Sequence, residues 1–531
     1  MTDIAPQSIL GKRSLRDVYN VTPAFLQLVE RPAAVHLRLA HRPYATVTEH
    51  GQARAQGPPT FPRPHNSEKD PPRAPSPSSS ASAPSPKLKT SEPSPRTGTP
   101  STQGPKRSDS PTSSLDDWEQ NPDLSISKFS ELPGKDFGVN QHMIINEEFK
   151  EALRQILWKF RAPIRYAFAY GSGVFPQKEI GPPSSQIKSL HPAPPEAIAK
   201  VQGQNPKMID FIFGVSYTQH WHAINLQEHR DHYSAVGSLG SYAVSKLQDS
   251  FGAGVYFNPY VIVNGTLIKY GVVNLDTLCK DLSEWNTLYL AGRLHKPVKI
   301  LRDNPSVRLA NQVNLISAVR TALLLLPPDF TERDLYSTIT GISYVGDPRM
   351  TIGGDDPRKV NNIVHGQMAN FRRLYAPLID NLPNISFNDS VCSDRSWFDD
   401  PGVNAKIAQD MDPVKRGNMV SRLPKVFREK LYFEYQSKFR IPRGEFNEML
   451  KKSTKEEAER FLRREGSEFE QRIARDTEGL KTEVKQVIEK TIRWPSITQS
   501  LKGVVMAGAR KGWRYAKEKR EKALAAAREK G

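Results

Sequence analysis

A carboxylate inside an otherwise apolar strand is the feature that most constrains this chain. Asp210 lies in the run Met208-Ile209-Asp210-Phe211-Ile212-Phe213, whose composition is that of a strand buried on both faces. An ionised carboxylate there is unfavourable unless a metal ion or a cation compensates its charge. The turn Gly171-Ser172-Gly173 follows an earlier aromatic strand, and its backbone N–H groups can bind an anion. Together these features predict a site for a metal ion and a nucleoside triphosphate.

Composition narrows the partners and the setting. The 531 residues carry a formal net charge of +18, which favours an anionic partner, whether nucleic acid, nucleotide or acidic membrane. Cys279 and Cys392 are the two cysteines, so a disulfide framework and a cysteine-built zinc site are excluded and a reducing compartment is expected. Apolar runs stay well short of the roughly 20 residues that span a bilayer. Any membrane role is therefore expected to be peripheral.

The chain divides by composition. Residues 1–50 have the basic amphipathic character of a mitochondrial presequence, although their acidic residues also fit an unstructured basic tail. Residues 51–132 are rich in Pro and Ser and read as a disordered linker. The rest is expected to be a nucleotide-binding α/β domain over 133–300, a helical domain over 301–390, a polar loop with charged helices over 391–495, and an amphipathic helix over 496–531.

Local patterns predict the elements around the turn and the acid. Apolar spacing predicts a helix over 147–160, and strands are expected over 164–170 and 208–215. A proline-rich insertion over 176–206 separates the two strands. The turn signal Asn264-Gly265 joins two further β-rich runs as a hairpin. Beyond residue 275 the pattern is mostly helical, with a second polar loop over about 384–425.

Several long motifs occur in one order along the chain. They are Tyr170-Gly-Ser-Gly-Val-Phe, Asp210-Phe-Ile-Phe, Trp221-His222…Asn225…His232-Tyr233-Ser234, Gly252-Ala-Gly-Val-Tyr-Phe-Asn258, Ile268-Lys-Tyr-Gly-Val and Asp281-Leu…Trp285-Asn-Thr-Leu-Tyr-Leu-Ala-Gly-Arg-Leu-His-Lys-Pro-Val298. Over about residues 135–390, and again in the last helix, the chain closely resembles the mitochondrial translocator assembly and maintenance protein family, the mitochondrial CDP-diacylglycerol synthases. That resemblance implies a polymerase-β-like nucleotidyltransferase domain. It also implies a magnesium-dependent reaction of CTP with phosphatidic acid, which releases pyrophosphate and feeds cardiolipin synthesis.

The resemblance also implies roles for individual residues. Gly171, Ser172 and Gly173 would hold phosphate oxygens, and Asp210 would be the main magnesium ligand. Polymerase-β-like enzymes carry acids two apart on this strand, but Ile212 stands at the second position here. The other ligand must then come from elsewhere, or from CTP phosphates and water.

Three basic residues and one histidine complete the predicted set. Lys269, on a strand, would point into the site and neutralise phosphate, or else lie at a strand edge and aid solubility. Arg293 and Lys296 would clamp the triphosphate or the lipid phosphate, or lie in an exposed loop. His222 would contact substrate. Four clustered histidines leave open a zinc site built by two of them on one helix face: His220, His222, His229 and His232.

The segment Leu501–Lys522 is the second functional signal. At helical spacing, Leu501, Val504 and Val505 share a face opposite Arg510 and Arg514, and the segment carries eight basic and two acidic residues. This pattern is typical of a helix lying on an anionic lipid surface, or of one docked on its own protein. The sequence therefore predicts a peripheral enzyme on the matrix side of the mitochondrial inner membrane, without nucleic acid. The alternatives are an RNA nucleotidyltransferase and a non-catalytic protein-import maintenance factor.

Overall fold

The structure is a computed structural model that describes residues 118, 124–177, 190–203, 206–347, 358–393, 395–450 and 466–507. The predicted presequence, nearly all of the predicted linker, residues 178–189 and 204–205 of the insertion, and residues 508–531 lie outside these residues. The first predicted helix and strands are confirmed as α2 (Glu147–Trp158), β1 (Tyr166–Tyr170) and β2 (Ile209–Val215).

A five-stranded sheet organises the first half of the described chain. Its order is β3-β4-β2-β1-β5, in which β2 and β4 run parallel and the other neighbours antiparallel. The new strands are β3 (Val255–Val263), β4 (Thr266–Asn274) and β5 (Lys299–Arg302). Asn264 and Gly265 both have positive φ, as a two-residue hairpin requires, so the predicted hairpin turn is confirmed. The predicted α/β class is correct.

Helices cover the sheet and connect its strands. Within the predicted insertion the structure contains α3 (Glu196–Gln202). The helix α4 (Thr218–Glu228) packs against β4, and α5 (Gly240–Ser250) packs against β3. After the sheet's β4 come α6 (Leu275–Glu284) and the short α7 (Ala291–Leu294). The α6 residue Leu275 packs against Gly214 of β2.

The long helix α8 (Pro305–Leu325) is the core of the second half. It is buried on nearly all sides, as expected of a helix enclosed by other elements. Around it lie α6, α7, α9, α12, α13 and α17. The remaining helices are α9 (Glu332–Ile342), α11 (Lys359–Gly366), α12 (Met368–Ile379), α13 (Pro413–Ser421), α14 (Lys425–Phe439) and α16 (Glu468–Arg475).

A second sheet lies where the sequence predicted only helices and a polar loop. Its strands β6 (Asp329–Thr331), β8 (Lys406–Gln409) and β7 (Ile385–Phe387) form an antiparallel sheet in that order. Each strand has only three or four residues, too few for an alternating pattern to be recognised. The domain predicted as helical is therefore mixed.

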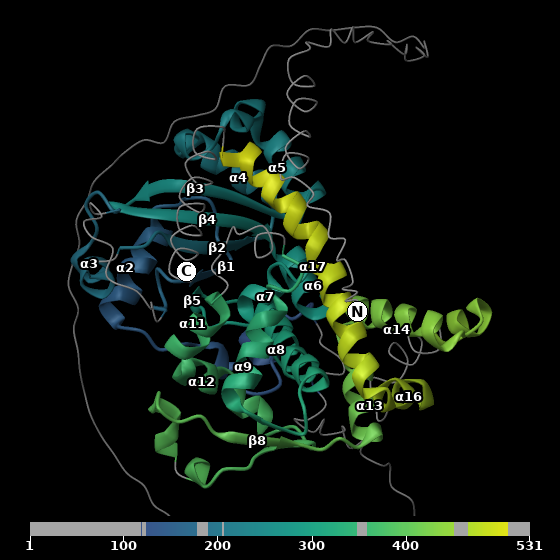
Figure 1. Cartoon of the computed structure of the whole chain (residues 1–531). Coiled ribbons are helices and arrows are strands. Elements are labelled where there is room, and N and C mark those ends of the chain that lie inside the picture. The colour runs from purple at the N-terminus through teal and green to yellow at the C-terminus, as the bar shows by residue number, and fades with distance from the viewer. Residues whose placement is uncertain are drawn as a thin grey trace, which may run out of the picture. The chain divides into compact units, whose positions relative to one another are not determined.

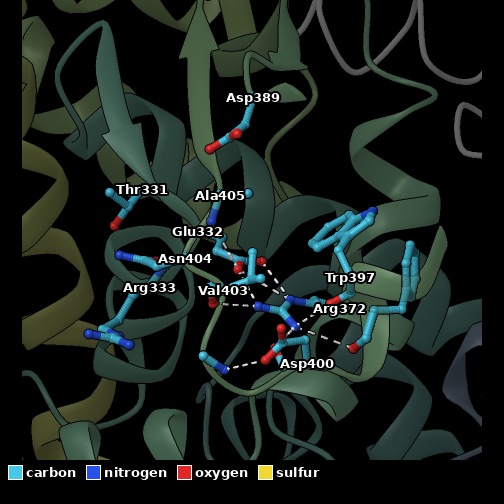
Figure 2. A network of polar contacts seen from close by, with 12 residues as sticks. Thr331, Glu332, Arg333, Arg372, Asp389, Trp397, Asp400, Val403, Asn404 and Ala405 are labelled. Carbon is cyan, nitrogen blue, oxygen red and sulfur yellow. Dashed lines mark hydrogen bonds and ion pairs between the residues drawn. The ribbon is translucent and has the colours of Figure 1, made fainter. Parts of the chain in front are cut away.

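A buried ion pair fixes this small sheet to the helices (Figure 2). Arg372 of α12 and Glu332 of α9 are both fully buried, with Nη2 and Oε1 2.5 Å apart. The same guanidinium donates to the carbonyls of Trp397, Asp400 and Val403 at 2.5–2.6 Å. Removing either charge would leave the other buried and unpaired, a cost of about 3–5 kcal/mol.

The helix α17 (Thr477–Ala507) runs diagonally from α13 and α16 to α4 and α5 (Figure 1). Near its end, the Gln499 side chain accepts from the Ala253 amide at 3.3 Å and donates to the Val255 carbonyl at 3.1 Å. Lys502 is buried and donates to the Gln248 and Phe251 carbonyls at 3.1 and 2.6 Å. Leu501, Val504 and Val505, in contrast, are exposed. One face of this helix is therefore docked on the protein, while the predicted apolar stripe is open.

Candidate active site

Asp210 lies at the centre of a short row of side chains across the sheet. It pairs with Tyr170 of β1 on one side and with Lys269 of β4 on the other, and directly paired residues share a face. The Lys269 Nζ is 3.5 Å from the Asp210 Oδ1, and the two side chains are 18% and 26% exposed. Lys269 therefore faces Asp210, and its role in neutralising phosphate stays a prediction.

The Asp210 carboxylate also suits a cation. Its Oδ1 is buried and accepts no hydrogen bond from the described residues, although Lys269 is near enough for an ion pair. A buried carboxylate oxygen without a donor is costly, and an oxygen-seeking ion such as Mg²⁺ would satisfy it. The neighbouring Lys269 is a cation and position 212 is an isoleucine, so neither can bind the ion. The ion would therefore need other oxygen ligands, such as water or phosphate.

The turn at residues 171–173 packs directly against this carboxylate. Gly171 has φ +81°, and a Cβ atom there would lie 3.5 Å from the Asp210 Oδ2. A Cβ atom on Gly173 would instead lie 2.7 Å from the Met208 carbonyl oxygen. Gly171 is thus required by backbone conformation and leaves an open approach beside the acid, whereas Gly173 is required by the packing of β2.

Substitutions in this turn are therefore expected to have two different effects, a loss of nucleotide binding or a loss of stability. Gly171→Val is expected to lower turnover and CTP affinity strongly, because the side chain strains the turn and fills the approach to Asp210. If the turn holds the triphosphate of CTP, as the family resemblance implies, Ser172→Ala should cost about 1–3 kcal/mol of CTP binding through one lost phosphate contact. Gly173→Ala should chiefly lower the melting temperature. Titration with CTP and thermal melts separate these effects, and unchanged CTP affinity in Gly171→Val would place the nucleotide elsewhere.

Arg293 approaches the row from α7. Its Cζ lies 3.9 Å from the ring centre of Tyr289, whose carbonyl it also bonds, and 5.9 Å from the ring centre of Tyr170. Burial raises the pKa of the Tyr170 hydroxyl, the charge of Asp210 raises it further, and Arg293 opposes the rise. Arg293 therefore belongs electrostatically to the Asp210 site.

Lys296 lies one helical turn further along. Its Nζ donates to the Gly292 carbonyl and, at 2.7 Å, to the Ser343 hydroxyl. Burial lowers its pKa well below the ordinary lysine value, and the neighbouring charges of Arg293 and Lys359 lower it further. Neither Arg293 nor Lys296 is a fully exposed loop residue.

Asp281 organises the loop that carries these two cations, and sequence reasoning missed it. Its Oδ1 accepts from the Thr287 amide, the Thr287 hydroxyl and the Leu288 amide, and its Oδ2 accepts from the Leu290 and Ala291 amides, all at 2.8–3.1 Å. These bonds hold two left-handed non-glycine residues, Trp285 at φ 58° and Leu288 at φ 56°. The motif around Asp281 was visible in the sequence, but its spacing does not tell which amides a carboxylate will meet.

His222 lies apart from the other predicted site residues. It is fully buried on α4, and its ring nitrogens are 2.8 Å from the Tyr233 hydroxyl and the Gln248 side-chain oxygen. Its neighbours join it to Tyr270, which points to the opposite face of β4 from Lys269. Burial lowers its pKa to about 4, so the ring is neutral near pH 7. Its contact with substrate stays a prediction that this arrangement does not favour.

The histidine-rich segment brings a different trio together. Ligand atoms of His229, Asp231 and His232 lie within 4.8 Å of one another. His232 also bonds the Tyr270 hydroxyl at 2.9 Å, and His229 lies 3.3 Å from the Lys159 carbonyl. With these protein partners for the imidazoles, the zinc interpretation gains little support.

Comparison with known proteins decides the family. The profile described as "Phosphatidate cytidylyltransferase, mitochondrial" matches residues 153–522, most of the chain and all of the site residues above. This chain belongs to the mitochondrial phosphatidate cytidylyltransferase family. Members of that name from Schizosaccharomyces pombe and Saccharomyces cerevisiae are 44% and 41% identical to it over 267 residues, half of this chain and 62–63% of their own length. A Xenopus laevis member is 34% identical over 373 residues, 70% of this chain and 94% of its own length. The family resemblance read from the motifs is thereby confirmed.

Proposed function

We propose that this chain is a phosphatidate cytidylyltransferase, which joins CTP and phosphatidic acid into CDP-diacylglycerol and releases pyrophosphate. The observation that carries the proposal is the Gly171 turn packed against Asp210, with Lys269 on the next strand, inside the region matched by the family. We assign the sheet to a polymerase-β-like nucleotidyltransferase domain. In such a domain a glycine turn after one strand binds the triphosphate, and an acid on the next strand binds the metal ion.

In the proposed reaction a phosphate oxygen of phosphatidic acid attacks the α-phosphorus of CTP. The new P–O bond forms as the bond to the β-phosphate oxygen breaks, and that oxygen leaves with pyrophosphate. Asp210 would hold Mg²⁺, whose chemistry is to neutralise phosphate charge during transfer. Lys269 and Arg293 would stabilise charge on the phosphoryl oxygens. The attacking oxygen is already anionic, so no strong general base is needed.

One assay separates this function from its rivals. Purified protein, magnesium and CTP are incubated with phosphatidic acid liposomes or with RNA, and pyrophosphate is measured. We expect pyrophosphate to be released when liposomes are supplied and not when RNA is supplied. Release with RNA would indicate an RNA nucleotidyltransferase, and no release with either would favour a non-catalytic import factor.

We further propose a mitochondrial location, peripheral on the matrix side of the inner membrane, where the product would feed cardiolipin synthesis. The relatives' names support the mitochondrial setting. Among the described residues, no helix has the length and apolar character needed to cross a membrane. The exposed Leu501, Val504 and Val505 provide an apolar stripe that can enter the headgroup region, and the basic residues of Arg510–Lys522 follow it in sequence.

The apolar stripe can be tested without undocking its helix. Changing Leu501, Val504 and Val505 together to serine should reduce binding to cardiolipin-containing vesicles at least about tenfold, because three side chains lose their burial in lipid. Deleting residues from 501 onward is less clean, since it also removes the docked Lys502. Co-sedimentation at low and high salt measures the effect, and wild-type binding should weaken with salt.

A matched triple change elsewhere provides the control. Val391, Val414 and Phe433 are exposed apolar residues on other elements, and serine at all three should leave sedimentation unchanged. Equal sedimentation of the wild type and the Leu501 triple variant would refute the anchor.

A further inference from the structure

A second group of cations lies beyond Arg293, around the ring of Tyr344. The Lys296 Nζ is 5.1 Å from the centre of this ring, and the Lys359 Nζ is 5.3 Å from it. Lys296 follows α7, Tyr344 follows α9 and Lys359 begins α11, so three separate elements bring the group together. An aromatic face attracts ammonium groups but carries no net negative charge.

Lys296 has no acidic partner among the described residues. Its ammonium has two neutral acceptors, the Gly292 carbonyl and the Ser343 hydroxyl. Burial and two neighbouring positive charges all disfavour its charged form, and no carboxylate offsets them. A partly buried cation in this setting is unfavourable unless an anion joins it. Lys296 therefore has the electrostatics of an anion-binding residue.

The position of this group indicates which anion it receives. Arg293 connects it to the Asp210 row: its Cζ lies 5.9 Å from the centre of the Tyr170 ring, and it precedes Lys296 by three residues in the same segment. In phosphoryl transfer the attacking and leaving oxygens are roughly in line on opposite sides of phosphorus. If the turn at Gly171 holds the leaving pyrophosphate beside Asp210, the attacking phosphate must come from the other side.

We propose that Lys296 and Lys359, with the Ser343 hydroxyl, bind the phosphate monoester headgroup of the lipid substrate. This assignment rests on the proposed function and resolves which of the two substrates Lys296 serves. A phosphate monoester carries close to two negative charges near pH 7, whereas the phosphodiester of other phospholipids carries one. Two ammonium groups at one ring match the dianion, so the subsite also selects phosphatidic acid from surrounding lipids.

Lys359→Met tests the subsite, because Lys359 is only half buried. Initial rates are measured against the mole fraction of phosphatidic acid in mixed micelles at saturating CTP, and CTP affinity is measured separately by titration. The half-saturating mole fraction should rise at least about tenfold, as expected when one charge-assisted hydrogen bond is lost. CTP affinity should stay within about twofold. Lys359→Arg should recover most of the loss.

Lys296→Met should likewise raise the half-saturating mole fraction of phosphatidic acid and leave CTP affinity unchanged, and thermal melts check that it folds. Lys415→Met is the control, because Lys415 is a half-exposed surface lysine paired with Asp410. Its kinetics should match the wild type. A rise in the CTP dissociation constant of Lys359→Met, with unchanged phosphatidic acid dependence, would overturn the proposal and assign the lysines to the triphosphate.

A binding measurement separates failure of the subsite from failure of the proposed function. Calorimetry without CTP compares dioctanoyl phosphatidic acid with dioctanoyl phosphatidylglycerol, a diester. The wild type should prefer the monoester, and Lys359→Met should lose that preference. Equal wild-type binding of both lipids would overturn the subsite even in an active enzyme. An inactive wild type that keeps the preference would overturn the function and leave the subsite.

Discussion

Asp210→Asn is expected to reduce CDP-diacylglycerol formation by about 10³-fold, the scale seen when one group that stabilises transition-state charge is removed. The amide keeps the shape of the side chain but loses the charge that would bind Mg²⁺ and that faces Lys269 at 3.5 Å. Folding should survive, because the Oδ1 atom accepts no hydrogen bond from the described protein. Radiolabelled CTP incorporation into lipid measures the loss, and melting curves check the fold.

The control is Asp136→Asn, which removes one exposed carboxylate and leaves the site intact. It should retain wild-type turnover. If Asp210→Asn were comparably active at saturating magnesium, the metal assignment and the proposed site would both fail.

Asp281→Ala is expected to have the second largest effect, on both stability and activity. Four backbone amides and one hydroxyl would lose their acceptor, and each buried donor left unpaired costs about 1–3 kcal/mol. The strained Trp285 and Leu288 would relax, and the loop carrying Arg293 would move. Urea unfolding should therefore show a loss of at least about 3 kcal/mol, together with a fall in kcat.

Asp389→Ala offers a comparison within the same chain. Asp389 also accepts backbone amides, from Val391 and Lys406, but it lies at the small sheet. Its replacement should change stability modestly and leave kcat unchanged. Asp281 would be only a structural residue if Asp281→Ala lost stability but kept full activity below its melting temperature.

The sequence predicted the half of the fold built on the five-stranded sheet better than the second half. Apolar β1 and β2, and the Asn264-Gly265 turn, carry strong local signals, and the structure has them nearly where expected. The three short strands of the second sheet depend instead on the Glu332–Arg372 pair and on carbonyls from residues 397–403. Such contacts join residues far apart in sequence, so no local pattern predicts them.

The same contrast holds within the site. Period-two alternation placed Lys269 opposite Tyr270, and register then brought it to Asp210. Lys359 and Tyr344 could not be found this way, because α7, α9 and α11 meet only through tertiary packing. His222 differs from these two: the resemblance places it near substrate, whereas its hydrogen-bonded neighbours reach Tyr270 on the other face of β4, so its role stays a prediction.

The docking of α17 has a consequence for how the chain is made. Gln499 occupies backbone groups at the start of β3, an edge strand, from a position 244 residues later in the chain. During synthesis the five-stranded sheet therefore exists for a time with that edge open. Open edges pair readily with other chains and promote aggregation. A nascent chain is thus most in need of a chaperone after residue 274 has emerged and before residue 499 has.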